Sequence, residues 1–339
     1  MKKNDNGEKI DFVILWVDGN DDKWRAEKKK YKNDGSDDRE ERYRDWEILK
    51  YWFRGVEKFA PWVNRIFFVT YGHLPEWLNT SHEKLVIVNH SDFIPEKYLP
   101  TFSSHAIELN LHRIQDLSEN FVYFNDDMFI LRPARKDLFF KNDLPCDTAV
   151  LNALCFARIP GSKLLFMVPA YDMVLINSNF DKNKVIKGNW KNWFSLKYGK
   201  DLLRTAALMP WRHFPGFALY HMPYSWKKST LQEIWDKEGD VLDETCSHRF
   251  RMSSDVNSWL VSYWQFASNR FYPRSPKSGS LLSIGDGDNS KVYDVIKNQK
   301  TSLCCINDKV SNPENYEEIK EQLQISFDTI LPEKSGFEV

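Results

Sequence analysis

The stretch that decides the fold is FVYFNDDMFI, residues 121–130, in which an apolar run ends in Asn125, Asp126 and Asp127 and then resumes. Its first half predicts a buried strand. Carboxylates beside such a strand are costly to bury unless a cation or strong hydrogen-bond donors meet them. Adjacent aspartates at a strand end can hold a hard divalent ion against nucleotide phosphates. An Asx turn or a helix N-cap is the alternative, and this stretch alone does not decide between them.

Two further apolar runs end in the same way. Residues 11–17 (DFVILWV) lead into Asp18 and Gly19, and residues 302–306 (SLCCI) lead into Asn307 and Asp308. If these strands are neighbours in one sheet, their acids meet at the edge where open α/β sheets bind ligands. Oxygen ligands from several strands are what Mg²⁺ or Mn²⁺ bridging a diphosphate needs. Each acid alone is better explained as a turn residue, but three such ends together favour chemistry.

The remaining pattern alternates strands with helices. Residues 65–70 and 84–89 predict strands, and residues 45–59 and 104–117 predict helices. This order indicates an α/β fold with a mostly parallel sheet of the nucleotide-binding type, flanked by helices. Later signals are weaker: strands at 148–153 and 171–176, and helices at 228–236 and 255–266. We expect one catalytic domain over residues 1–335.

Residues 188–217 are rich in Trp, Phe, Lys and Arg and predict a helical, aromatic-rich insertion or lid. Packing of these aromatic side chains in a subdomain is the preferred interpretation. The alternative is a peripheral face on a membrane, since aromatic and basic side chains also suit a lipid surface.

Bulk properties exclude several classes of protein. Lys and Arg number 47 against 48 Asp and Glu, whereas a nucleic-acid binder is usually more basic. Neither a GxxxxGK[ST] loop nor GxGxxG occurs, which disfavours kinases and dehydrogenases. The five cysteines lack metal-site spacing and indicate reduced thiols of a cytoplasmic protein. With no signal peptide and no apolar stretch near roughly 18 residues, we expect a soluble or peripheral protein.

Other candidates are a histidine and two arginines. His221 lies in HMPY, where Pro223 fixes the local backbone, and a histidine can act as general base near neutral pH. Arg251, and Arg44 before Asp45, can bind phosphate oxygens. Each of these residues alone is more often structural. Acids for a metal, arginines for phosphate and a histidine base together indicate phosphoryl transfer.

Four blocks of this sequence resemble the Stealth family. They are IDFVILWVDGND near the start, the long block from RYRDWEILKYWF to ENFVYFNDDMFI, the block from HMPYSWKK to HRFRMSSDVNSWLVSYWQF, and SLCCINDK. The family includes bacterial capsular and cell-wall polysaccharide phosphotransferases and the catalytic part of the animal enzyme that makes the lysosomal mannose-6-phosphate tag. The short chain favours the bacterial branch.

The resemblance implies a Rossmann-like, glycosyltransferase-A-like fold and a divalent metal, Mg²⁺ or Mn²⁺. It also implies transfer of a sugar 1-phosphate from a nucleotide sugar, typically UDP-linked, to a hydroxyl of an acceptor glycan. Nucleoside monophosphate would be released. The acceptor could be lipid-linked, with the enzyme in the cytoplasm or at the inner face of the membrane.

The matching positions imply roles for individual residues. The catalytic group is His221, Arg251 and Asp127; the substrate-binding group is Asp18, Gly19, Arg44, Asp45, Asn125 and His105; the metal-binding group is Asp126, Asp127, Asn307 and Asp308. Trp46 departs from the pattern, because relatives commonly have Asn there. Two other classes stay open: a conventional metal-dependent glycosyltransferase that releases nucleoside diphosphate, and a non-catalytic glycan-binding protein that uses its tryptophans for stacking.

Overall fold

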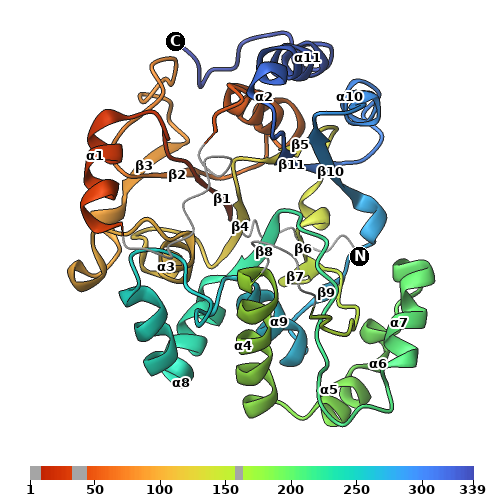
Figure 1. Ribbon diagram of the computed structural model, residues 1–339. Helices are drawn as coiled ribbons and strands as arrows, with labels where there is room; N and C mark the ends of the chain where they lie inside the picture. Colours follow the sequence, from red (N-terminus) through yellow and green to blue (C-terminus); the bar gives the residue numbers. More distant parts are fainter. Residues whose placement is uncertain (1–8, 33–43, 157–162) are drawn as a thin grey trace.

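The computed structural model describes residues 9–32, 44–156 and 163–339. Its largest sheet has the strand order β3-β2-β1-β4-β8 (Figure 1). Neighbours among β3, β2, β1 and β4 are parallel, whereas β8 is antiparallel to β4. The predicted Rossmann-like, mostly parallel sheet is therefore confirmed. The strand bounds are β1 (Ile10–Leu15), β2 (Ile66–Thr70), β3 (Leu85–Asn89), β4 (Asn120–Phe124) and β8 (Tyr224–Lys227).

The apolar runs of the sequence form the centre of this sheet because both faces are covered. Strands β2 and β4 are buried along their whole length. Trp52 of α2 (Leu49–Phe59) packs against Phe12 of β1 and Phe124 of β4, with ring centroids 6.5 and 5.4 Å away. On the same side, Tyr51 stacks on Phe327 of α11 (Tyr316–Asp328). The amphipathic pattern that predicted α2 thus reflects its packing on the sheet.

Two more groups of strands complete the β structure. One sheet has the order β10-β11-β5 and the other β6-β7-β9. Their bounds are β5 (Met128–Ile130), β6 (Phe140–Lys141), β7 (Leu144–Asp147), β9 (Tyr272–Pro273), β10 (Gly279–Gly285) and β11 (Leu303–Lys309). The condition that the strand at 302–306 is a neighbour of the other two in one sheet is not met, because β11 pairs with β10 and β5 instead.

The end of β11 nevertheless reaches the end of β4. The chain leaves β4 through a turn of residues 125–127, which we call the acidic turn, and enters β5 directly. The Met128 amide donates to the Asn125 carbonyl oxygen (3.1 Å), and the Ile306 amide donates to the Asp127 carbonyl oxygen (2.9 Å). Asn307 and Asp308 therefore arrive beside the acidic turn through the smaller sheet.

Helices account for the rest of the described chain. In Figure 1 the α4–α9 group lies below the main sheet, where α3 packs on α8 and α4 packs on α9. The remaining bounds are α1 (Asp22–Tyr31), α3 (Ser104–Leu109), α4 (Lys163–Asn179), α5 (Lys182–Gly188), α6 (Trp190–Trp193), α7 (Leu202–Ala207), α8 (Lys228–Ser247), α9 (Trp259–Ala267) and α10 (Ser290–Lys297).

Several local predictions are corrected. The strand expected at 171–176 lies inside α4, whose sequence is apolar on all sides and so gives no periodicity to separate helix from strand. At 148–153 only an isolated bridge joins Leu151 to Phe217. The helix expected at 104–117 ends at Leu109, and a 3₁₀ turn follows at Leu111–Arg113.

Residues 188–217 contain α6, a 3₁₀ segment (Leu196–Asp201) and α7. All five cysteines are free, and four of them are buried. Among the described residues, no helix combines the length and apolar character that crossing a membrane requires.

Candidate active site

A cavity of about 620 Å³ lies at the carboxyl ends of β1 and β4. Because β2 and β3 extend the sheet on one side of β1 while β4 lies on the other, this is the switch point where α/β sheets form a ligand crevice. Predicted site residues converge on its walls from four parts of the chain: Arg44 and Asp45; Asn125, Asp126 and Asp127; Arg251; and Asn307 and Asp308.

The acidic turn carries the least compensated charge of the cavity. The Asp127 Oδ1 atom is buried without a hydrogen-bond partner among the described residues, while Oδ2 accepts from the Cys305 thiol (3.1 Å). Burial raises the pKa of Asp127, and His221 and the thiol oppose that rise. The pKa of Asp126 is raised mainly by the loss of water around the carboxylate, and further by the negative charges of Asp127 and Asp45. The turn thus gathers negative charge that a cation would stabilise.

His221 is held beside this turn. One ligand atom each from Asp127, His221 and Cys305 lie within 4.8 Å of one another. The backbone of His221 is left-handed (φ 47°), and its Nδ1 atom lies 2.9 Å from the Tyr224 hydroxyl. That hydroxyl also accepts a hydrogen bond from Trp259 Nε1 (3.0 Å). A non-glycine residue with positive φ is uncommon, so the surroundings of His221 hold it in a specific orientation.

The possible metal ligands at this site fit a hard divalent cation better than a soft one. Burial raises the pKa of Cys305, so its thiol stays protonated and donates to Asp127 rather than offering a thiolate. The unpartnered Asp127 oxygen and the neighbouring Asp126 carboxylate are oxygen ligands, which Mg²⁺ and Mn²⁺ prefer.

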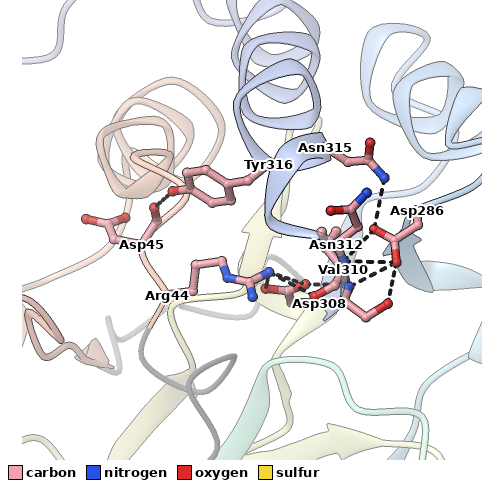
Figure 2. Close-up of polar contacts among 9 residues, drawn as sticks. Arg44, Asp45, Asp286, Asp308, Val310, Asn312, Asn315 and Tyr316 are labelled. Atoms are coloured by element: carbon pink, nitrogen blue, oxygen red, sulfur yellow. Dashed lines mark hydrogen bonds and ion pairs between the residues drawn. The ribbon is translucent and has the colours of Figure 1, made fainter.

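Figure 2 shows how Arg44 and Asp308 meet. Arg44 Nη1 lies 3.2 Å from an Asp308 carboxylate oxygen and donates to the Val310 carbonyl oxygen (3.1 Å). A predicted phosphate-binding arginine and a predicted metal ligand are therefore paired with each other. The segment after β11 is fixed by Asp286, which accepts from the Ser311 amide (3.0 Å).

The wall formed by residues 44–46 is held by the C-terminal helix. The Tyr316 hydroxyl donates to the Asp45 carbonyl oxygen (Figure 2), and its ring packs against Trp46 with centroids 4.8 Å apart. Trp46, the position that departs from the family pattern, lines the cavity.

Arg251 and His105 share a neighbourhood but differ in exposure to the cavity. Arg251 lines it and donates to the Ser104 hydroxyl (2.6 Å). His105 is buried beside Asp255, 3.0 Å from its carboxylate, and lies outside the described lining. Burial lowers the pKa of His105, and Asp255 opposes this. His248 binds the other Asp255 oxygen (2.7 Å), so Asp255 joins two histidines.

Asp18 and Gly19 also lie outside the described lining, although the preceding residue Val17 contributes to it. The Asp18 carboxylate accepts from the Asn20 amide (2.8 Å), as in an Asx turn, and the Asp18 amide donates to His73 Nε2 (2.7 Å).

Sequence reasoning missed two acids of this region, Asp255 and Glu108. Glu108 lines the cavity and accepts from the Tyr123 hydroxyl (3.0 Å). The sequence offers one signal for Glu108, because it lies between the apolar residues Ile107 and Leu109. An acid on the surface would be expected among polar residues. Asp255 lies in a polar stretch that gives no such signal.

The α/β fold and this cavity, with its carboxylates, arginines and adjacent histidine, are those of a transferase enzyme. Models of Stealth protein conserved regions 1, 2 and 3 match residues 8–36, 42–147 and 220–267. The capsular polysaccharide phosphotransferase WcwK of Streptococcus pneumoniae is 41% identical over 98% of this chain and 99% of its own. The chain belongs to the Stealth family, as its sequence blocks predicted.

Two other relatives have related names. The receptor polysaccharide phosphotransferase WefC of Streptococcus gordonii is 41% identical over 98% of this chain and 99% of its own. The exopolysaccharide phosphotransferase cps2G of Lactiplantibacillus plantarum is 39% identical over 97% and 96%. A solved galactosyltransferase, LgtC with donor and acceptor sugar analogues, aligns over 92% of this chain and 95% of its own at 8% identity and a TM-score of 0.36. That likeness is too distant to support an argument.

Proposed function

We propose that this protein transfers a sugar 1-phosphate from a nucleotide sugar, UDP-linked in the expected case, to a hydroxyl of a polysaccharide acceptor. The observation that carries the proposal is that the acidic turn lines the cavity together with Arg251 and that His221, which lies outside the described lining, is held next to Asp127. The names of relatives that match nearly the whole chain support the same chemistry.

The reaction is an in-line displacement at the sugar-proximal phosphorus. The acceptor oxygen forms a bond to this phosphorus, and the bond from the phosphorus to the oxygen bridging the two phosphates breaks. The electron pair leaves with nucleoside monophosphate. His221 accepts the proton of the attacking hydroxyl. Arg251 donates hydrogen bonds to phosphoryl oxygens whose charge changes in the transition state.

Asp126 and Asp127 are the residues that would hold a divalent cation, with Asn307 and Asp308 as further oxygen ligands. When bound, such an ion neutralises diphosphate charge. Asp308 is paired with Arg44 in this structure, so we propose that the two separate when Arg44 turns to donor phosphate. Asn125, Asp45, Asp18 and Gly19 are proposed to bind the rest of the donor. We propose that His105, which lies outside the cavity lining, contributes only indirectly, through its position next to Ser104 of the lining.

Nucleotide release tests this function. Purified protein would be incubated with UDP-N-acetylglucosamine and other nucleotide sugars, Mg²⁺ or Mn²⁺, and an acceptor glycan extract. We expect nucleoside monophosphate, no product after chelation with EDTA, and recovery when the ion is restored. Nucleoside diphosphate instead would identify a conventional glycosyltransferase. Binding of glycan without metal or nucleotide, together with no turnover of any donor, would favour the glycan-binding alternative.

The role of His221 is tested separately. Because general-base catalysis contributes on the order of 10²-fold or more, His221→Ala should lower turnover at least that much. His213→Ala is the matched control, because His213 is an exposed histidine outside the cavity lining. Near-normal turnover by His221→Ala would show that another group takes the proton.

We further propose that residues 1–335 act as one catalytic domain with residues 188–217 as a helical insertion. We also propose that the enzyme is cytoplasmic, because nucleotide-sugar donors are cytoplasmic compounds, and that its glycan acceptor is attached to a lipid carrier.

A further inference from the structure

Residues 188–217, which we call the insertion, expose four large apolar side chains. The exposed fractions are 58% for Trp190, 90% for Leu196, 73% for Leu203 and 56% for Trp211. These residues lie on α6, the 3₁₀ segment, α7 and the chain that follows α7. Four exposed large apolar side chains within one 30-residue segment make this segment a candidate site of interaction.

The exposure does not come from loose packing of the insertion. Trp193, three residues after Trp190, is fully buried, and its Nε1 donates to the Asn269 side chain (3.0 Å). Phe214 and Phe217 are buried and pack with each other at 5.4 Å between ring centroids. The buried aromatic residues therefore anchor a folded scaffold that presents the exposed ones.

The apolar side chains on α7 follow helical spacing. Leu203, Ala206 and Ala207 are exposed at positions i, i+3 and i+4, which lie on one face of a helix. Thr205, between them in sequence, is buried and its hydroxyl accepts from the Leu151 amide (3.1 Å). The outward face of α7 thus carries Leu203 and two alanines beside the exposed Arg204, whereas Leu202 and Thr205 face the protein.

The insertion also carries a positive net charge, although the Nζ of one of its cations, Lys197, donates to the Pro273 carbonyl oxygen (3.0 Å). The insertion contains one acid, Asp201, against five cations: Lys191, Lys197, Lys200, Arg204 and Arg212. Asp201 faces the protein, where it accepts from the Tyr220 hydroxyl (3.0 Å). In a chain whose net charge is -1, this segment is a local basic region. A second copy of the chain would bring the same positive charge to the contact, which disfavours self-association through this surface.

We propose that the insertion docks the protein on an anionic lipid surface. Trp190, Leu196, Leu203 and Trp211 enter the boundary between head groups and acyl chains, and the lysines and arginines contact the lipid phosphates. The insertion continues into the site, since Tyr220 binds Asp201 and directly precedes His221. Docking therefore places the His221 side of the protein close to the lipid surface.

Sedimentation of the full chain with vesicles tests the proposal. Vesicles of phosphatidylcholine with phosphatidylglycerol are compared with pure phosphatidylcholine at low and high salt. We expect binding to the anionic vesicles that weakens as salt screens the charges. A Leu196→Ser/Leu203→Ser variant should bind at least about tenfold more weakly, given the free energy of burying a leucine. The matched control is Leu281→Ser/Ile325→Ser, which removes two other exposed apolar side chains.

The proposal is overturned if the protein does not bind anionic vesicles at low salt, or if both double variants bind equally. It is also overturned if ultracentrifugation shows dimers that the Leu196→Ser/Leu203→Ser variant abolishes. Vesicle binding requires neither donor nor turnover, so this test is independent of the proposed reaction. Circular dichroism of each variant checks that it is folded.

Discussion

The acidic turn and the insertion both hold side chains where packing alone would not place them. The turn buries a charged group, whereas the insertion exposes apolar ones. At the turn, a carboxylate oxygen of Asp127 is buried and has no hydrogen-bond partner in the part of the chain that the structure describes. In the insertion, Leu196 and Leu203 are largely exposed. Each arrangement is unfavourable for the isolated protein, because a buried charge and an exposed apolar surface both raise the free energy of the folded state. The comparison supports our two proposals, that a cation and phosphates bind at the acidic turn and that a lipid surface binds the insertion.

The surroundings of each region show that the arrangement is supported. A hydrogen bond from the Cys305 thiol and the electrostatic influence of the nearby His221 partly compensate the charge of Asp127. Buried Trp193 and Phe217 support the insertion. A locally misfolded segment would have neither kind of support.

The largest effect is expected at the turn. Asp127→Asn keeps the shape of the side chain but removes its charge, so nucleotide release should fall on the order of 10²–10³-fold. Thermal stability should stay equal or rise, because a buried charge is lost. The control is Asp137→Asn, an exposed acid outside the cavity. Normal turnover by Asp127→Asn, or a large loss of stability, would contradict a functional role for this buried charge.

A pair of tryptophans sharpens the comparison within the insertion. Trp193→Ala should lower the free energy of unfolding by about 3–5 kcal/mol, because a fully buried indole leaves a cavity. Trp190→Ala should change it by no more than about 0.5 kcal/mol, as expected of an exposed side chain. Urea denaturation of both variants measures the difference. Similar losses would mean that Trp190 is also part of the packed core.

The pH dependence of stability probes the buried wall of the cavity. Burial lowers the pKa of His90 to about 4. In the unfolded chain this histidine is protonated below roughly pH 6.5, whereas in the folded protein it stays neutral until the pH falls to about 4. Stability from this group is present above pH 6.5 and is lost as pH falls toward 4, by up to roughly 3 kcal/mol. His90→Gln should lack that part of the pH dependence. Thermal melts of both proteins from pH 4 to 8 measure it, and parallel curves would show that His90 does not contribute.

Much of the fold could be predicted because its centre is buried on both faces. Strands β1, β2 and β4 each contain a run of four consecutive apolar residues in the sequence. Helix α4 could not be predicted, since it is apolar all round and shows no helical period. The sheet to which β11 belongs could not be predicted either, because its partner β5 is only three residues long and distant in sequence.

The site divides in the same way. Asn125, Asp126 and Asp127 were predictable because they interrupt an apolar run. Asp255 was not, because a buried acid in a polar stretch has no local signature. The contact of Arg44 with Asp308 depends on tertiary structure alone, since the two residues are 264 positions apart. Resemblance to the family supplied these positions, but their pairing required the structure.

The most direct test of the central claim follows the phosphorus that joins the sugar to the donor. A nucleotide sugar carrying radioactive phosphorus only in its sugar-proximal phosphate would be incubated with the enzyme, a divalent metal and the acceptor glycan. Our account predicts that the label moves to the glycan and that the released nucleotide is an unlabelled monophosphate. Label recovered in a nucleoside diphosphate, with unlabelled sugar on the glycan, would contradict it.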